Sequence, residues 1–186
     1  MSPETSAPRV QEIGGLAGNF TLPGVNGGQI NLSTLLDAKK GAVVVFWSGV
    51  CSHCIRYDGY LNSFTERHPE LALAVIASRA GETPEQIRKT MAERGILFPI
   101  GHDQGSVVAR QWSTEQTPRA FLVDSGGVLH YRGAIDNFKY PGDPEYVGHL
   151  ETAISEFLEG KPVKRAETSS FGCAIQSVYY TLPKHL

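Results

Sequence analysis

Runs of consecutive apolar residues alternate along this chain with stretches in which apolar residues recur every three or four positions. Residues 42–47 and 71–77 are continuous apolar runs, which are typical of strands buried on both faces of a sheet. Between these runs, the helical spacing of the apolar residues predicts one helix over about 51–66. Strands that alternate with helices in this way predict a sheet covered by helices.

Capping residues mark the ends of the other predicted helices. Thr83, Pro84 and Gln86 predict a helix start, because Thr caps the first turn, Pro suits the first position and Gln returns the capping bond. Gly95 predicts its end. Three further helices are expected: a short one over 34–38 capped by Ser33, one near 106–112, and a last one from Asp143-Pro144-Glu145 to Gly160.

Glycine-rich turns predict two hairpins and complete the fold class. Residues 26–28 separate short strands at 19–22 and 29–32, and residues 124–127 separate strands at 120–123 and 128–132. With a further short strand near 98–101, the expected fold is α/β: a central mixed sheet flanked by helices on both faces. An N-terminal tail (1–18), one domain (19–160) and a C-terminal extension (161–186) are expected.

Composition narrows the possible partners. The chain has 186 residues, a net charge of -2 and 41% hydrophobic residues, which describe one soluble domain. Lys and Arg form no basic stripe, so no nucleic-acid partner is expected, and no apolar run reaches the roughly 20 residues of a membrane span. A full-length chain would be cytoplasmic, whereas a chain that has lost a signal peptide would be periplasmic or otherwise extracytoplasmic.

Three cysteines, Cys51, Cys54 and Cys173, bring in the first candidate chemistry. A C-x-x-C pair is either a redox pair or half of a zinc site, and zinc needs two more ligands. Cys173 stands alone, and five histidines show no matching spacing: His68, His102, His130, His149 and His185. Redox chemistry is therefore favoured, and no metal or cofactor is expected, although His53 and Cys173 joining the pair around a metal is an alternative.

The position of the pair assigns roles to its members. At a strand-to-helix junction, Cys51 is expected to face solvent, with helix amides and the helix dipole stabilising its thiolate. Cys51 is then the nucleophile, and Cys54, one turn later, is the resolving thiol. Protonated His53 would lower the pKa of Cys51 further and make the pair oxidising, although a solvated residue without a role is the alternative.

Three motifs in this order resemble the thioredoxin superfamily. They are the strand at 43–47, the Cys51-Ser52-His53-Cys54 motif, and Thr117-Pro118 leading into the strand that ends at Asp124. Over about 19–158 the chain is most similar to the redoxin branch, the thiol–disulfide oxidoreductases and peroxiredoxin-like proteins related to alkyl hydroperoxide reductase. The resemblance implies a thioredoxin-like fold, and a cis Pro118 beside the cysteines, where the preceding backbone can pair with an extended substrate.

The chain also departs from that pattern. Thioredoxins have Trp immediately before the first Cys, whereas this chain has Val50 there and Trp47 further upstream, so partner contacts would differ. Some relatives place Glu three residues after the second Cys, where this chain has Tyr57. Asp58 is the nearest carboxylate; it would either relay a proton to Cys54 or lie in solvent.

Cys173 lies in the segment Phe171-Gly172-Cys173-Ala174-Ile175, beyond the resemblance. The first interpretation is a buried, inert thiol in an apolar stretch. If Cys173 instead approaches Cys51 or Cys54, it would serve as a second resolving thiol or help to bind a metal.

Three functions remain in competition. The leading hypothesis is dithiol–disulfide exchange with protein thiols, protein disulfides or small thiols, served by an upstream reductase or oxidase. The second is a thiol peroxidase in which Cys51 attacks peroxide, Ser48 supplies a hydroxyl and Arg119 stabilises the thiolate, although both residues also have ordinary explanations. The third is a non-catalytic module that binds a metal or a partner.

Overall fold

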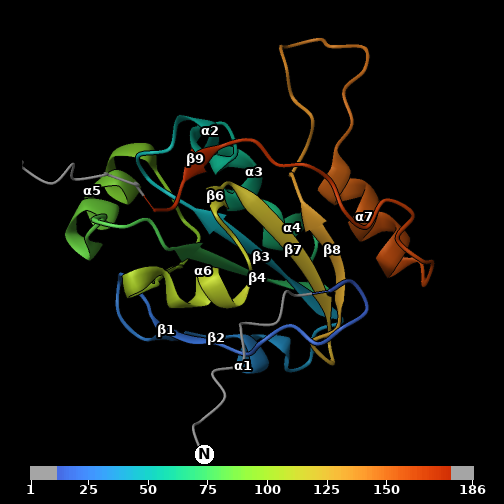
Figure 1. The fold of residues 1–186 in the computed structure, drawn as a ribbon, viewed down its shortest axis with the longest axis horizontal. Coiled ribbons are helices and arrows are strands. Elements are labelled where there is room, and N and C mark those ends of the chain that lie inside the picture. Colours follow the sequence, from blue (N-terminus) through green and yellow to red (C-terminus); the bar gives the residue numbers. More distant parts are fainter. Residues whose placement is uncertain (1–11, 177–186) are drawn as a thin grey trace, which may run out of the picture.

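A computed structural model describes residues 12–176 of the chain. A five-stranded mixed sheet at its centre is made of β3 (Gly41–Trp47), β4 (Leu71–Ala77), β5 (Ile100–His102), β7 (Arg119–Asp124) and β8 (Leu129–Gly133). The strand order is β5-β4-β3-β7-β8 (Figure 1). β3, β4 and β5 run parallel, whereas β7 is antiparallel to both β3 and β8. The predicted mixed sheet is confirmed.

Two small ladders and seven short helices complete the described fold. The ladders pair β1 (Thr21–Pro23) with β2 (Gln29–Asn31) and β6 (Gln116–Thr117) with β9 (Cys173–Ala174). The helices are α1 (Leu32–Leu36), α2 (Ser52–Ile55), α3 (Asp58–Asn62), α4 (Phe64–Arg67), α5 (Pro84–Arg94), α6 (Val107–Gln111), which follows the 3-10 turn η1 (Gln104–Ser106), and α7 (His149–Leu158).

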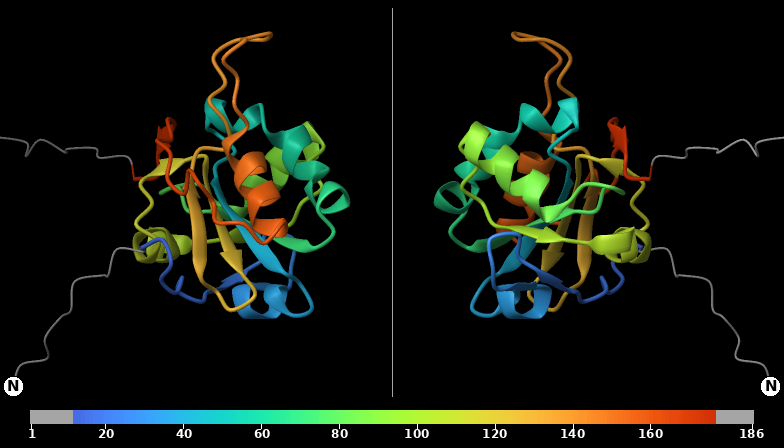
Figure 2. Two further views of the ribbon diagram at one scale, coloured as in Figure 1. Left: turned by 90° about the vertical axis from the view of Figure 1, so that its right-hand side faces the viewer. Right: turned by 90° about the vertical axis from the view of Figure 1, so that its left-hand side faces the viewer.

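Helices cover both faces of the sheet (Figure 2). Side chains alternate along each strand, so each strand contributes to the core on both faces. On β3, Val43 and Val45 belong to the core that also holds both motif cysteines and residues of α3, α4, α5 and α7. Val44 and Phe46 belong to a second core with α1, α6 and the β1–β2 hairpin. All seven residues of β3 are buried, so its predicted burial on both faces is confirmed.

The predicted capping box of α5 is also confirmed. The hydroxyl of Thr83 accepts a hydrogen bond from Gln86 N at 3.2 Å, and the Gln86 side chain accepts one from Thr83 N at 2.9 Å. Gly95 ends the helix with a φ of 63°, the left-handed conformation that favours glycine.

The single helix expected over 51–66 is wrong: the segment forms the three short helices α2, α3 and α4. Tyr57 and Ser63, with ψ near zero, interrupt it. The Ser63 hydroxyl donates to the carbonyl of Gly59 at 3.1 Å, and such side-chain bonds to the preceding turn compete with regular helix geometry. The apolar face was read correctly, because Leu61 and Phe64 are fully buried.

Two predicted helix starts are also wrong. α1 begins at Leu32 rather than after Ser33, because the Asn31 side chain accepts a hydrogen bond from Thr34 N at 2.9 Å and so caps the helix. α7 begins at His149, well after Asp143. The Asp143 carboxylate accepts a hydrogen bond from Glu145 N at 2.9 Å, which is a local turn rather than a helix cap.

The segments around α7 determine the outline of the molecule. Residues 134–148, drawn in orange between β8 and α7, stand out from the body (Figures 1 and 2). Residues 161–176 then return across the body: Glu167 bridges to Arg132, and Cys173 and Ala174 form β9. This return path positions the end of the described chain beside α2.

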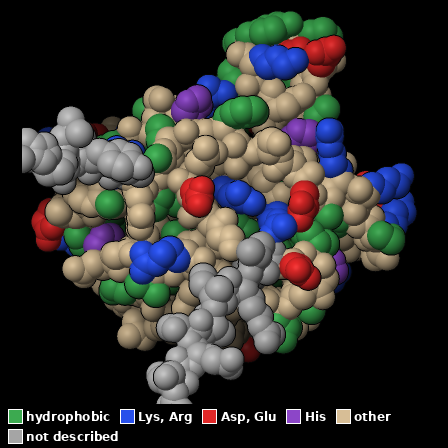
Figure 3. Space-filling model, in the orientation of Figure 1, with side chains coloured by type: hydrophobic (Ala, Val, Ile, Leu, Met, Phe, Trp, Pro, Cys, Tyr) green, Lys and Arg blue, Asp and Glu red, His purple; other side chains and the backbone are tan. Residues whose placement is uncertain are grey.

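Residues 12–176 contain no helix that is both long and apolar enough to cross a membrane. On the face drawn in Figure 3, acidic and basic side chains are interspersed rather than gathered by sign. This mixed face presents no broad field of one charge to a partner.

Candidate active site

Cys51 and Cys54 lie where β3 gives way to α2. The chain leaves the sheet after Trp47, Cys51 is the residue before the first turn of α2, and Cys54 N donates to Cys51 O at 3.0 Å. Both cysteines are free, and both are 0% exposed. The expectation that Cys51 faces solvent is therefore wrong, because other parts of the chain cover its sulfur.

Two side chains that sequence reasoning missed hold the loop before Cys51. The Glu82 carboxylate accepts hydrogen bonds from the Ser48 hydroxyl at 2.7 Å and from Gly49 N at 2.8 Å. Arg94 donates to Gly49 O at 3.0 Å and to both carboxylate oxygens of Asp58 at 2.6 and 2.7 Å. No motif marks Glu82 or Arg94, because their partners lie on a distant segment. The loop is thus clamped from both sides.

Pro118 lies beside the cysteine pair, as the resemblance implied. The Thr117–Pro118 peptide bond is cis, and Pro118 is buried. The Cys51 sulfur lies 3.3 Å from the carbonyl oxygen of Thr117, to which the thiol donates. The backbone before Pro118 is therefore in direct contact with Cys51.

β9 covers this backbone. Cys173 is the antiparallel partner of Thr117 in the β6–β9 ladder. A Cβ on Gly172 would lie 1.7 Å from the Thr117 carbonyl oxygen, so only glycine allows the two backbones to pass this closely. Cys173 is partly exposed and packs against the core that holds Cys51 and Cys54. The expectation that Cys173 is buried is therefore wrong.

The surroundings separate the pKa values of the two motif thiols. A hydrogen bond from Cys54 is the main cause that lowers the pKa of Cys51 to about 4; burial opposes it, and bonds from Cys173 and Thr117 add to it. The bond to Cys51, burial and the charge on Cys51 all raise the pKa of Cys54. Burial first, then the bond to Cys51, raises the pKa of Cys173.

This differs from the expected source of thiolate stabilisation. α2 has only four residues, and no side-chain capping bond joins Cys51 to it. The backbone of Ser52 and His53 acts instead on Cys173, where it lowers the pKa against the larger raising effects of burial and Cys51. Contacts between thiols, rather than a long helix dipole, stabilise the Cys51 thiolate.

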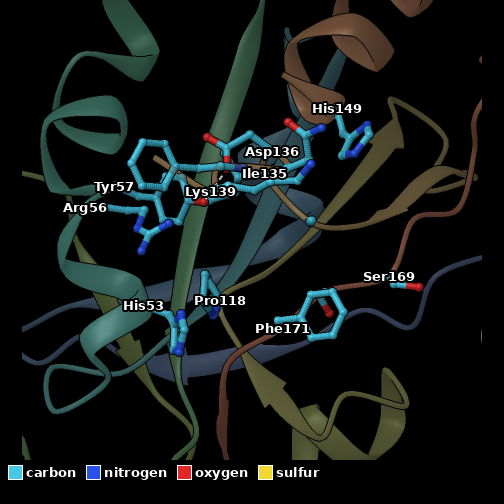
Figure 4. A pocket seen from close by; sticks show the side chains of 14 residues that line it. His53, Arg56, Tyr57, Pro118, Ile135, Asp136, Lys139, His149, Ser169 and Phe171 are labelled. Carbon is cyan, nitrogen blue, oxygen red and sulfur yellow. Dashed lines mark hydrogen bonds between the residues drawn. The ribbon is translucent and has the colours of Figure 1, made fainter. Parts of the chain in front are cut away.

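A pocket of about 450 Å³ opens beside the pair. His53, which is exposed, and Phe171 from the tail lie on either side of Pro118 in its wall (Figure 4). Also in the wall, the Tyr57 hydroxyl donates to Asp136 at 2.5 Å, and burial followed by this bond raises the pKa of Tyr57. The pocket joins the cysteine motif, the tail and the 134–139 segment into one concave surface.

The remaining candidate residues lie apart from the reacting sulfurs. Trp47 is fully buried against Phe98, so it cannot contact a partner. Asp58 is ion-paired with Arg94 rather than free in solvent, and no hydrogen bond among residues 12–176 joins it to Cys54. Arg119 lies over the Phe121 ring, on the sheet face opposite the motif cysteines, which contradicts its role as a partner of the Cys51 thiolate.

A metal site was the other alternative for these side chains. Residues 12–176 contain no group of three or more His, Cys, Asp or Glu side chains arranged to hold a metal ion.

The chain is similar to several known proteins. The model of the AhpC/TSA family matches residues 13–132. A Bacillus thuringiensis (strain Al Hakam) protein named thiol-disulfide oxidoreductase ResA is 28% identical over 116 residues, which cover 62% of this chain and 66% of that protein, just under two thirds of its length.

Solved structures support the fold. The structure of a hypothetical protein from Sinorhizobium meliloti 1021 has a TM-score of 0.78 at 27% identity, covering 90% of this chain and 95% of that one. A Chlorobium tepidum protein, described as a thiol:disulfide interchange protein of the DsbE type, has a TM-score of 0.65 at 21% identity, covering 80% and 99%. These likenesses confirm the predicted thioredoxin-like fold.

Proposed function

Because the chain belongs to the AhpC/TSA family and has two contacting cysteines beside Pro118, we propose that it is a thiol–disulfide oxidoreductase. Cys51 and Cys54 form the pair that cycles between dithiol and disulfide. The observation that carries this function is the contact between the two thiols, which moves their pKa values in opposite directions. One thiol is thereby prepared to attack and the other is kept protonated until it is needed.

The chemistry follows from that division. The Cys51 thiolate attacks a disulfide sulfur of the partner, a mixed disulfide forms, and the partner's other sulfur leaves as a thiolate. Cys54 then loses its proton and attacks the Cys51 sulfur, which gives the Cys51–Cys54 disulfide and a partner dithiol. Two electrons pass from the protein to the partner, and the reverse sequence oxidises the partner.

Formation of the mixed disulfide makes Cys54 ready for the second step, its attack on Cys51. The pKa of Cys54 is raised mainly by its bond to Cys51 and also by the charge on Cys51. When Cys51 is bonded to a partner, its sulfur carries no charge, so both causes weaken and Cys54 becomes easier to deprotonate. Formation of the mixed disulfide thus activates the thiol that resolves it.

The site favours exchange over the peroxidase alternative. Arg119 is on the other face of the sheet, and the Ser48 hydroxyl donates to Glu82. Fast consumption of hydrogen peroxide by the reduced protein, lost in Cys51→Ser, would instead support a peroxidase.

Equilibration against glutathione buffers of known poise tests the proposal. We expect a Cys51–Cys54 disulfide with a potential above the roughly -270 mV of thioredoxin, because stabilising the thiolate favours the reduced form. Cys51→Ser should abolish insulin reduction, and the matched Cys54→Ser should accumulate disulfide-linked Cys51 without turnover. Failure of the wild-type pair to form a disulfide at any glutathione poise would refute the function.

A further inference from the structure

The most reactive thiol of the site has no exposed surface. Cys51 is 0% exposed, and the segment that covers it carries the third cysteine of the chain. Because Cys51 has no exposed surface, its direct attack on a partner disulfide requires β9 to move aside. The covering thiol, Cys173, is partly exposed and therefore has access to both solvent and the pair.

We propose that Cys173 is a third exchanging thiol, which transfers the disulfide between the covered Cys51–Cys54 pair and the outside partner. This inference rests on the proposed oxidoreductase function and specifies its route. It stands on the position of β9, because the antiparallel register pairs Cys173 with Thr117, and the Cys51 sulfur lies 3.3 Å from the Thr117 carbonyl oxygen.

The contacts between the two segments are reciprocal. Cys173, through its thiol and its backbone, lowers the pKa of Cys51, while the backbone of Ser52 and His53 acts to lower the pKa of Cys173. The two sulfurs are therefore neighbours across the β6–β9 ladder, and the backbone of α2 partly offsets the burial that raises the pKa of Cys173.

The tail is anchored on both sides of Cys173, so the contact is a fixed feature. Upstream, the Thr168 hydroxyl accepts a hydrogen bond from Ala134 N at 2.9 Å. Downstream, Ile175 is 2% exposed in the core of the opposite sheet face, and its N–H donates to Glu115 O at 2.9 Å. The segment crosses the site between these two anchors and keeps Cys173 at a high effective concentration near Cys51.

The transfer is two balanced exchanges. In the oxidised protein, the Cys173 thiolate attacks Cys51, the Cys51–Cys173 disulfide forms, and Cys54 leaves as a thiolate that takes up a proton. A thiolate of the partner dithiol then attacks the Cys173 sulfur and releases the Cys51 thiolate. The partner's second thiol displaces Cys173, so the partner ends as a disulfide and the protein has gained two electrons.

The leaving group of the second exchange, in which the partner attacks Cys173, favours this route. Disulfide exchange is faster when the departing thiol has a low pKa, and the pKa of Cys51 is the lowered one. Attack on the accessible Cys173 sulfur therefore expels the better leaving group. When Cys51 is held in a disulfide, its charge no longer raises the pKa of Cys173, which eases the first exchange.

Disulfide mapping in the full chain tests the contact. Cys54→Ser, oxidised by glutathione disulfide, should form an intrachain Cys51–Cys173 link in most molecules. Gly172→Ala in that background should lose the link, because its Cβ would collide with Thr117 O, whereas Gly126→Ala, where the nearest atom to a Cβ would be 3.4 Å away, should keep it. Cys54→Ser that forms only glutathione adducts or interchain dimers would overturn the inference.

Kinetics test the transfer itself. Cys173→Ala should still form the Cys51–Cys54 disulfide, but reduction of that disulfide by dithiothreitol should slow at least about tenfold, since the high local concentration of the intermediate thiol is lost. Ser169→Ala, an exposed change in the same segment, should not slow it. Equal or faster reduction in Cys173→Ala would show that β9 only covers the site. A wild-type protein without the Cys51–Cys54 disulfide would instead refute the proposed function.

Discussion

The loop before Cys51 and the strand that carries Cys173 meet at the same point but are held in different ways. The loop is clamped by charged side chains, with Glu82 on its N–H side and Arg94 on its carbonyl side. β9 is held chiefly by backbone contacts, a two-residue ladder against β6, with Ile175 as its apolar anchor. The loop is thus held by side chains, whereas the tail is held chiefly through its backbone and requires a particular side chain only at Gly172 and Ile175.

This difference separates the two tasks of an exchange site. The reacting pair needs a constant geometry, which the hydrogen bonds to Glu82 and Arg94 maintain. β6, the strand before Pro118, pairs through its backbone, so it binds an extended strand with little dependence on the side chains of that strand. Changes in the clamp should therefore affect the stability of the whole domain, whereas changes in the tail should affect thiol chemistry.

The largest expected effect comes from breaking the clamp. Glu82→Ala leaves the Ser48 hydroxyl and the Gly49 N–H without their acceptor, and buried unsatisfied donors cost about 1–3 kcal/mol each, so we expect a loss of about 2–3 kcal/mol. Urea denaturation of the reduced protein measures it. Glu93→Ala, an exposed change on α5, the helix that follows Glu82, is the control and should change stability by less than about 0.5 kcal/mol. Equal midpoints for the two variants would show that the clamp contributes nothing.

The parts of these two segments that depend on local sequence were predicted, whereas the parts that depend on contacts between residues distant in the sequence were not. The strand at 43–47, the cysteine pair and Pro118 were all predicted, because apolar runs and short motifs encode local structure and carry a family resemblance. Glu82 was not found, because a buried carboxylate that serves a loop 33 residues away leaves no periodic pattern.

The position of Cys173 beside the pair was only an alternative to the first interpretation, for the same reason. The pairing of β9 with β6 joins residues 56 positions apart, and a two-residue strand has no alternation to detect. The adjacent Gly172 was the available signal, since a glycine before a cysteine in an extended apolar stretch is typical of close backbone approach. The helix over 51–66 failed differently: its apolar spacing was correct, but side-chain bonds of Ser63 break the regular turns.

A smaller effect should follow from removing the tail's contribution to Cys51. Cys173→Ala deletes one hydrogen bond to the thiolate, so we expect the pKa of Cys51 to rise from about 4 by about one pH unit. Absorbance of the thiolate at 240 nm during acid titration of the reduced protein measures it. The Ser169→Ala titration should overlay the wild type, and an unchanged midpoint in Cys173→Ala would remove Cys173 from the electrostatics of the pair.

The lowered pKa of Cys51 also makes the stability of the reduced protein depend on pH. Because folding lowers the pKa of Cys51, the thiolate stabilises the reduced folded protein fully above the pKa of the unfolded thiol, and this contribution is lost as pH falls through about 4. In Cys173→Ala the loss should be complete at a higher pH than in the wild type. Urea midpoints of the two reduced proteins across acidic pH therefore give a second reading of the same contact.

The smallest effect belongs to His53, which is exposed beside the pair and was predicted from its position alone. An exposed cation near a thiolate contributes about 0.5–1 kcal/mol, which for a two-electron couple corresponds to roughly 10–20 mV. His53→Ala removes a side chain whose positive form favours the Cys51 thiolate, so the potential measured at acidic pH should become more negative by that amount. His53→Lys should preserve it, because the charge stays. A potential equal to wild type in His53→Ala at acidic pH would leave Cys54, Cys173 and Thr117 as the groups that tune Cys51.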